Sequence, residues 1–447
     1  MRIQKENGAW YDSWDKEPYV FDSAQILKGL IAIRDIMPEV DWHIQKGCDW
    51  ILSNMQPNGR LTTPNPEAWG NDENFCSEIV HLYCLSPIRE AGKIFNNLEY
   101  EKKVNKIIAY YKKEKVDKIT NFSLLSHFYA YVMEALYDLG EIELCTESMM
   151  KLEKYRDAKG GIPGLKDVSW VCSTGMFQLA VVWYKLGDLE RGNSLFNYAL
   201  SLQNETGGWY GSYLEPSFFS SLHKGRKKPY YFPDSEISWT IKYFLDALAL
   251  KEKLEFEKMA SAFIDTIDEN DGRYEIIKKI IIEEAKTKGR KMSICDIGCG
   301  KGRYLKRLVE ELPNNNYFAS DISKNVMESI DYIDEARQGM LTFIPYGDEV
   351  FDVVYTCEAF EHAINIKGAF KELCRITKKG GIFIIIDKPQ DKLGNMKLYA
   401  WEQWISDDDM KKFSNECGCS IQIVPSLVYE NGKKDGLFRA WLFRKEK

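Results

Sequence analysis

The chain has 447 residues and a formal net charge of −7 at pH 7, with 45% hydrophobic and 28% charged residues. This length exceeds that of one ordinary hydrophobic core, so two domains are expected. The acidic balance excludes a basic field for nucleic acid, no apolar run approaches the roughly 18 residues of a membrane span, and no apolar signal region opens the chain.

The cysteines give a first indication of compartment and metal content. There are eleven, an odd number, and most lie inside apolar runs. This usage indicates reduced, buried thiols in a cytoplasmic protein. Cys417 and Cys419 are close enough for a metal pair, but no second pair or nearby histidine completes a site, so no metal is expected.

Residues 1 to 268 are predicted to be helical and to contain a repeat. Glycine-rich loops recur along this part, and neighbouring loops are about fifty residues apart, with one wider gap of about double that, a period typical of repeat architectures. The four loops are Asn7-Gly8-Ala9-Trp10, Asn58-Gly59-Arg60-Leu61, Lys159-Gly160-Gly161-Ile162 and Thr206-Gly207-Gly208-Trp209.

The helices after these loops alternate in character. A mostly apolar segment such as Trp170 to Leu186 is followed by an amphipathic one such as Leu189 to Leu202. A mostly apolar helix must be buried, whereas an amphipathic helix can face water. The pattern predicts inner helices surrounded by outer helices. The last predicted pair is Glu236 to Leu250 with Leu254 to Ile267.

The motif Gln203 to Trp209 resembles the glutamine–tryptophan motif of the α/α-toroid proteins, which include squalene–hopene cyclases and protein prenyltransferase β subunits. The resemblance implies an α/α toroid. The catalytic motifs of those families do not carry over, since Asp234-Ser235-Glu236 lacks the cyclase acid pattern. Aromatic residues beside carboxylates in the loops suit sugar rings, with packing between repeats as the alternative: Trp10, Tyr11, Trp14, Trp69, Asn71, Asp72, Glu73, Trp170, Trp209, Tyr210, Tyr213, Tyr230, Tyr231, Asp234 and Glu236.

The polar segment Asp268 to Gly272 interrupts the helical pattern. Such a polar, glycine-containing stretch is typical of a domain boundary. We therefore expect a toroid domain, residues 1–268, that binds the acceptor of the reaction, and a second domain, residues 274–447.

The second domain opens with a glycine-rich turn. The apolar run Met292 to Ile297 predicts a buried strand, and it leads through Gly298, Gly300 and Gly302 into the amphipathic stretch Tyr304 to Glu311. Glycines at a strand–helix turn let a ligand approach backbone N–H groups. A dinucleotide fingerprint places its third glycine one position later, at Arg303, and lacks an acid at the position of Asp296. The turn therefore favours an amine-bearing ligand.

These residues resemble the class I S-adenosylmethionine-dependent methyltransferases. Further landmarks follow in the family's order, including Asp321 after the next strand and Ile344-Pro345-Tyr346, Phe351 to Tyr355, Glu361-His362, Leu373 to Ile376 and Lys379-Gly380-Gly381. The resemblance implies a Rossmann-like α/β domain with a seven-stranded sheet and a terminal hairpin around Asn431-Gly432. It also implies that S-adenosylmethionine is bound by Asp296, Gly298, Cys299, Gly300, Gly302, Asp321, Ile322, Met340, Leu341 and Cys357.

One position departs from the family pattern. Many relatives carry an acid five residues before the proline, where it accepts from the adenine amino group, and this chain has Met340 there. The adenine is then held by backbone groups alone, or the cofactor is bound weakly.

Methyl transfer from a sulfonium is an in-line displacement that needs alignment of the acceptor and removal of a proton, and no metal. The acceptor should lie outside the carboxyl ends of the fourth and fifth strands. His362, the only histidine of this domain, is the first candidate for a general base, followed by Asp387 and Glu361. The alternative for the Glu361-His362 pair is a structural and cofactor-lining role, and for Asp387 a turn cap.

The sequence predicts a two-domain methyltransferase. The expected acceptor is a small molecule or glycan: a hydroxyl, less often an amine, of a sugar or surface-polysaccharide intermediate. Two alternatives remain. One is methylation of a lipid, isoprenoid or peptide-derived metabolite in an apolar toroid cavity. The other is a non-catalytic scaffold with a degenerate domain, which Met340 favours and the intact Asp296, glycines and Asp321 oppose.

Overall fold

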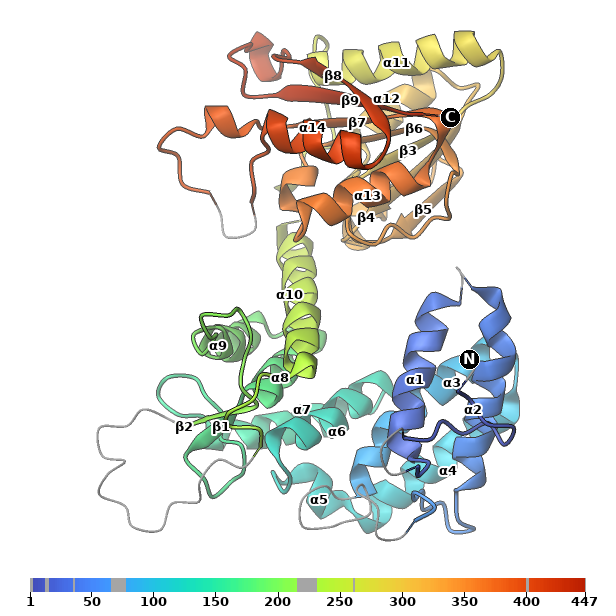
Figure 1. Ribbon diagram of the computed structural model, residues 1–447, viewed down its shortest axis with the longest axis vertical. Coiled ribbons are helices and arrows are strands. Elements are labelled where there is room, and N and C mark those ends of the chain that lie inside the picture. The colour runs from blue at the N-terminus through green and yellow to red at the C-terminus, as the bar shows by residue number, and fades with distance from the viewer. Residues whose placement is uncertain are drawn as a thin grey trace. The chain divides into compact units, whose positions relative to one another are not determined.

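The chain forms two compact units, Met1–Lys251 and Glu252–Lys447. The boundary between the units follows Lys251, whereas the sequence predicted it later, at the polar segment Asp268 to Gly272. Phe256, Met259 and Phe263, which follow this boundary, line a cavity of the second unit. The computed structural model (Figure 1) describes residues 3–12, 16–34, 37–65, 78–214, 231–259, 262–398 and 402–446.

The first unit is helical apart from a small two-stranded antiparallel sheet, β1 (Trp170–Cys172) with β2 (Ser212–Leu214). The all-α prediction for this part is confirmed, whereas the toroid arrangement stays a prediction. In the described ranges, no helix is long and apolar enough to cross a membrane. The helices are α1 (Val20–Ile33), α2 (Asp41–Ser53), α3 (Leu85–Ile94), α4 (Leu98–Glu114), α5 (Val116–Thr120), α6 (Ser126–Asp138), α7 (Ile142–Leu152), α8 (Ser173–Lys185) and α9 (Leu189–Leu200), and α10 (Ser238–Met259) begins in this unit and ends in the second.

The predicted alternation of buried and amphipathic helices is present. In α6 every residue from Ser126 to Leu136 is buried, and in α8 every residue from Ser173 to Tyr184. Their partners α7 and α9 bury only one face. Helix α6 packs against α7 and α8, and α8 packs against α9. Burial of whole helices inside amphipathic ones is the arrangement that their apolar patterns require.

The four glycine loops form one recurring turn. The first glycine of each has a positive φ, between 88° and 98°, a region that side chains disfavour. Each loop is closed by one backbone hydrogen bond, in which the N–H of a residue donates to the carbonyl of the fourth residue after it at 2.8–2.9 Å. A Cβ atom at Gly8 would lie 2.1 Å from the carbonyl oxygen of Lys46 on α2, so the loop packs directly against a helix.

Two expectations for the helical part need correction. Helix α10 runs without a break to Met259, so the predicted helix pair 236–250 and 254–267 is wrong; the residues across the expected break, Leu250-Lys251-Glu252-Lys253, are all good helix formers. The loop tryptophans Trp10, Trp170 and Trp209 are buried packing residues. Trp14, residues 69–73 and Tyr230 lie outside the described residues.

The second unit contains a seven-stranded mixed sheet in the order β5-β4-β3-β6-β7-β9-β8. Its first five strands are parallel, and β9 is antiparallel to both β7 and β8, so the expected sheet and terminal hairpin are confirmed. The strands are β3 (Ser293–Ile297), β4 (Asn316–Asp321), β5 (Glu335–Gln338), β6 (Phe351–Cys357), β7 (Thr377–Asp387), β8 (Cys419–Val424) and β9 (Arg439–Lys445); the helices are α11 (Gly272–Lys288), α12 (Arg303–Glu311), α13 (Ile366–Ile376) and α14 (Asp407–Glu416).

Helices cover both faces of this sheet, because its central strands are apolar on both sides. Ile277 of α11 and Leu305 of α12 belong to one core. Phe370 of α13 and Met410 of α14 belong to the other. Strand β3 lies between β4 and β6, so the chain crosses in opposite directions on its two sides. Ligands of open α/β sheets bind in the crevice at this switch point, beyond the carboxyl ends of the strands.

Candidate functional site

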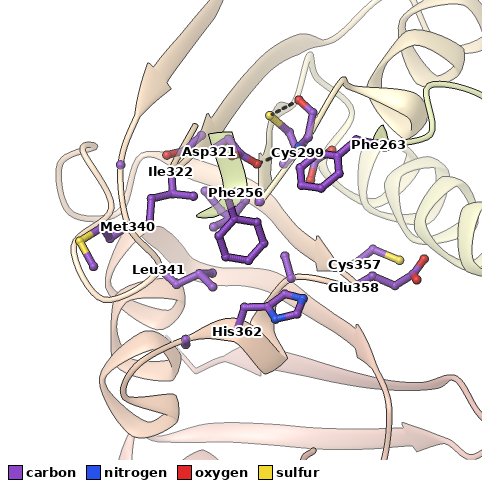
Figure 2. Close-up of a pocket in the computed structure, with 18 of the residues that line it drawn as sticks. Phe256, Phe263, Cys299, Asp321, Ile322, Met340, Leu341, Cys357, Glu358 and His362 are labelled. Carbon is purple, nitrogen blue, oxygen red and sulfur yellow. Dashed lines mark hydrogen bonds between the residues drawn. The ribbon is translucent and has the colours of Figure 1, made fainter. Parts of the chain in front are cut away.

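A cavity of about 340 Å³ lies at the carboxyl ends of β3, β4 and β6 in the second unit (Figure 2). Most of the residues expected to bind a cofactor line it, together with the histidine expected to act as a base. They are Asp296, Gly298, Cys299, Gly300, Asp321, Ile322, Met340, Leu341, Cys357 and His362. Of the predicted residues, Gly302, Glu361 and Asp387 do not line this cavity.

The glycine turn after β3 leaves room at the cavity floor. Gly298 has φ +74°, and a Cβ atom there would lie only 2.3 Å from the Cβ of Ala359, so only glycine fits. Gly300 has φ +53° and its backbone N–H donates to Asp321 Oδ2 at 2.9 Å. Gly302 lies behind the cavity at the start of α12, where a Cβ would meet the Tyr332 hydroxyl at 2.5 Å.

Asp321, the last residue of β4, is nearly buried and is held by two backbone N–H groups. Its Oδ2 accepts from Gly300 and its Oδ1 accepts from Ser323, both at 2.9 Å. Burial raises the pKa of this carboxyl. An ionised carboxylate offers about four acceptor positions, so Asp321 can accept from a pair of ligand hydroxyls in addition.

Asp296 adds a second acid to the same cavity. Its side chain is only 2% exposed. Burial raises the pKa of Asp296 to about 8, and the neighbouring Asp321 carboxylate adds to the shift. A buried carboxyl of this kind gains free energy from a ligand cation, because the cation compensates the cost of ionising it. The site is therefore suited to an amine-bearing ligand.

Glu358 fixes the loop after β6 from below. The backbone of Glu358 has a positive φ of 55°, which is uncommon for residues other than glycine, asparagine and aspartate. Its carboxylate accepts from Arg273 Nη1 at 2.6 Å and from Arg303 Nη2. Arg273 also pairs with Asp271 at 2.7 Å. The network connects the loop after β6 to the starts of α11 and α12, and Arg303 and Glu358 line the cavity.

His362 occupies the opposite wall, in the short helical turn Phe360–His362. Its side chain is 21% exposed. Figure 2 shows the ring of Phe256 beside its imidazole, and the ring centroids are 5.2 Å apart in an edge-on arrangement. The histidine can therefore reach a molecule in the cavity while one side of its ring is covered by an apolar group.

Phe256 belongs to a wall that sequence reasoning missed. Residues 252–259 and 262–264, expected in the helical domain, contribute apolar side chains to the cavity, and Glu257 Oε1 accepts from the backbone N–H of Lys324 at 3.2 Å. The spacing of Phe256, Met259 and Phe263 along one helical face was the available signal. The members of this wall are Glu252, Phe256, Met259, Ala262, Phe263 and Ile264.

Glu361 and Asp387 lie beneath the cavity. Asp387 is fully buried, and its oxygens accept from the backbone N–H groups of Glu361 and Lys388, each at 3.0 Å. Glu361 Oε1 accepts from Lys388 Nζ at 2.6 Å. Burial raises the pKa of both carboxyls, that of Asp387 to about 6. Their hydrogen bonds support the turn that carries His362.

The described residues fit S-adenosylmethionine. The cavity combines the glycine turn at Gly298 and Gly300 with two acids, Asp321 for hydroxyl groups and the buried Asp296 for an amine. Met340, Leu341 and Ile322 form an apolar side. Figure 2 shows Met340 and Leu341 on the side of the cavity where Ile322 and Asp321 lie. No carboxylate replaces the missing adenine acceptor among the residues 339–342 that line this side.

Comparisons with known proteins agree with this geometry. Residues 295–385 match the family described as a methyltransferase domain. The sterol 24-C-methyltransferase of Schizosaccharomyces pombe is 32% identical over 98 residues, 20% of this chain and 26% of that protein. The malonyl-[acyl-carrier protein] O-methyltransferase of Buchnera aphidicola is 32% identical over 99 residues, 21% and 38% respectively. A crystal structure of a possible histamine N-methyltransferase from Thermotoga maritima covers 43% of this chain and 98% of its own, at 17% identity and TM-score 0.32.

The chain thus spans only about a quarter to two fifths of the length of these curated relatives. The similarity falls in the second unit, which carries a methyltransferase domain with S-adenosylmethionine as its methyl donor.

Proposed function

We propose that the protein transfers a methyl group from S-adenosylmethionine to an apolar acceptor of the lipid or isoprenoid class, with His362 as the general base. The carrying observation is the composition of the cavity beside His362. Phe256, Met259 and Ile264 line the cavity together with Ala363 and Ile364. An apolar lining of this kind stabilises an apolar ligand through burial of its surface.

The sugar hydroxyl expected from the sequence is a poorer match for this cavity than an apolar acceptor. Sugar recognition requires several polar side chains beside a stacking ring, and the carboxylate of Glu358 in this wall is already engaged by Arg273 and Arg303. One relative supports an apolar acceptor, since the Schizosaccharomyces pombe protein is named for a sterol.

The proposed roles follow from position. When bound, the cofactor supplies an electrophilic methyl group on its sulfonium. Asp321 holds hydroxyl groups and Asp296 holds the amine, so both acids orient the donor. The imidazole of His362 takes the proton that the acceptor loses, and the ring of Phe256 packs edge-on against it. Lys388, Glu361 and Asp387 fix the turn that carries the histidine.

The test is label transfer from methyl-labelled S-adenosylmethionine with two acceptor panels, isoprenoid alcohols and long-chain aliphatic alcohols against uncharged monosaccharides. We expect label in the organic-soluble product. His362→Ala should lower the rate about 10²- to 10⁴-fold while binding of S-adenosylhomocysteine changes little. The control is Asp408→Asn, at a carboxylate whose side chain is 96% exposed. Label recovered only in the sugar panel would contradict the proposal, as would an unchanged rate in His362→Ala.

A further inference from the structure

The helical unit contains a cavity of its own. It measures about 370 Å³ and lies entirely among residues of Met1–Lys251. Aromatic rings dominate its lining: the Phe21 and Tyr131 centroids are 4.8 Å apart, and those of His127 and Tyr131 are 4.7 Å apart. Three helices, α1, α6 and α10, supply the lining residues, Phe21, Asp22, Gln25, His127, Phe128, Tyr131 and Trp239.

A chain of buried hydrogen bonds sets the tautomer of His127. Burial opposes the ionisation of Glu134, but the ammonium groups of Lys185 and Lys28 lower its pKa to about 2. The Glu134 side chain is therefore a carboxylate, which accepts hydrogen bonds and donates none. Gln178 Nε2 donates to Glu134 Oε2 at 3.2 Å. The oxygen of the same amide therefore faces His127, where Gln178 Oε1 lies 2.9 Å from Nδ1.

The consequence is a lone pair on the other ring nitrogen. Burial lowers the pKa of His127 to about 3, so the imidazole is neutral and carries one proton. That proton must be on Nδ1, because only an N–H can pair with the oxygen of Gln178. Nε2 is then an acceptor that a ligand hydroxyl can donate to. The fixed acceptor belongs to a residue that lines the cavity.

The ammonium groups near this cavity are balanced by carboxylates. Lys28 Nζ lies 3.5 Å from the centroid of the Tyr83 ring, and Lys185 Nζ bridges Glu134 at 3.1 Å and Asp138 at 2.7 Å. Burial lowers the pKa of Lys28, while Glu134 and Asp138 act in the opposite direction. Because these charges compensate one another, the aromatic lining is matched to an uncharged ligand.

We propose that this cavity binds an uncharged sugar ring, whose C–H face lies against the aromatic side chains and one of whose hydroxyls donates to Nε2 of His127. Asp22 and Gln25, one turn apart on α1, supply further polar groups for the remaining hydroxyls. Aromatic rings beside a few fixed polar groups are the general features of such sites. The site is separate from the methyl-transfer cavity and the proposal does not depend on the acceptor methylated there.

The test is saturation-transfer difference NMR on the full chain with the methyl glycosides of glucose, galactose, mannose and N-acetylglucosamine. At least one is expected to receive saturation, and Trp239→Ala should reduce that signal at least 5-fold. Trp239 is 36% exposed, so its removal leaves the core intact. The matched control is Trp42→Ala, an exposed tryptophan of the same unit that does not line the cavity, and it should leave the signal unchanged.

A second variant tests the hydrogen-bond chain. Gln178→Met keeps the size of the side chain but releases His127, and it should also weaken the signal. The thermal transition of the helical unit, followed by far-ultraviolet circular dichroism, serves as a folding check for each variant and is expected to stay as in the unaltered chain. Absence of transfer to all four sugars would overturn the proposal. So would signals that Trp239→Ala leaves unchanged, or saturation of choline in place of the sugars.

Discussion

At the scale of single residues, the cavity of the second unit holds two buried acids in different settings. Asp321 is compensated by two backbone N–H donors, whereas the folded chain stabilises Asp296 mainly in its protonated form. A carboxyl whose pKa lies near 8 is neutral at pH 7 until a cation arrives. Binding of an amine at Asp296 must therefore release a proton, and its free energy must depend on pH.

The first prediction concerns ligand binding at Asp296. The affinity for S-adenosylhomocysteine should rise from pH 6.0 to 7.5, with proton release visible by calorimetry in buffers of different ionisation enthalpy. Asp296→Asn should weaken binding about 10- to 100-fold, the range of one hydrogen bond to a charged group, and abolish the pH dependence. An affinity independent of pH in the unaltered chain would contradict this role.

The same substitution should stabilise the ligand-free protein. The folded chain holds the Asp296 proton more tightly than the unfolded chain does, so the stability contribution of this carboxyl falls as pH rises from about 4 towards about 8. At pH 7 Asp296→Asn removes that cost, and each 1 kcal/mol gained raises the melting temperature by roughly 2–4 °C. A lower melting temperature in the variant would contradict the assignment.

At the scale of elements, the end of α10 shows what sequence reasoning could and could not predict. Strand β3, the glycine turn and the order of the later strands were predictable, because a short apolar run, three glycines and Asp321 are local signals. Phe256 and Phe263 were not assigned to the site. Phe256 lies on α10, which follows the preceding helices without a break, and which cavity an apolar face covers depends on tertiary packing, which periodicity does not reveal.

The three candidate catalytic residues differ in whether they line the cavity, for a related reason. His362, Glu361 and Asp387 were all plausible from strand-end positions, yet only the histidine lines the cavity. Whether a side chain at a strand end points into the crevice or into the protein depends on the turn that follows, and here the backbone N–H groups of Glu361 and Lys388 hold Asp387 inside.

The second prediction concerns this wall. Phe256→Ala removes the ring beside His362 and should weaken binding of S-adenosylhomocysteine about 5- to 30-fold, which corresponds to about 1–2 kcal/mol of lost burial for a partly buried aromatic ring. Met396→Ala is the control, since Met396 is 53% exposed and does not line the cavity. Equal affinities of the two variants, measured by calorimetry, would show that the segment is not part of the site.

At the scale of the whole molecule, the chain joins two units with separate cores. The two hydrophobic clusters of the sheet contain residues of the second unit only. The helical unit has its own buried helices, α6 and α8, and its own cavity. Units with independent cores are expected to unfold as separate cooperative transitions.

The third prediction follows from this division. Differential scanning calorimetry of the full chain should show two transitions, and S-adenosylhomocysteine should raise only one of them. At a ligand concentration of 100 times Kd the gain is about 2.7 kcal/mol, or roughly 5–10 °C for a unit of this size. A single transition that shifts as a whole would contradict the independence of the two units.

The most direct measurement is calorimetric titration of S-adenosylhomocysteine into the full chain and into Asp321→Asn, with Asp408→Asn as the matched exposed control. The substitution keeps the shape of the Asp321 side chain but removes its negative charge and one of the two oxygens that accept hydrogen bonds from the cofactor's hydroxyl groups. We predict micromolar binding to the unaltered chain and to the control, and a loss of about 30-fold or more, roughly 2 kcal/mol, in Asp321→Asn. No binding to the folded chain, or equal binding to all three proteins, would contradict the assignment of this cavity as the cofactor site.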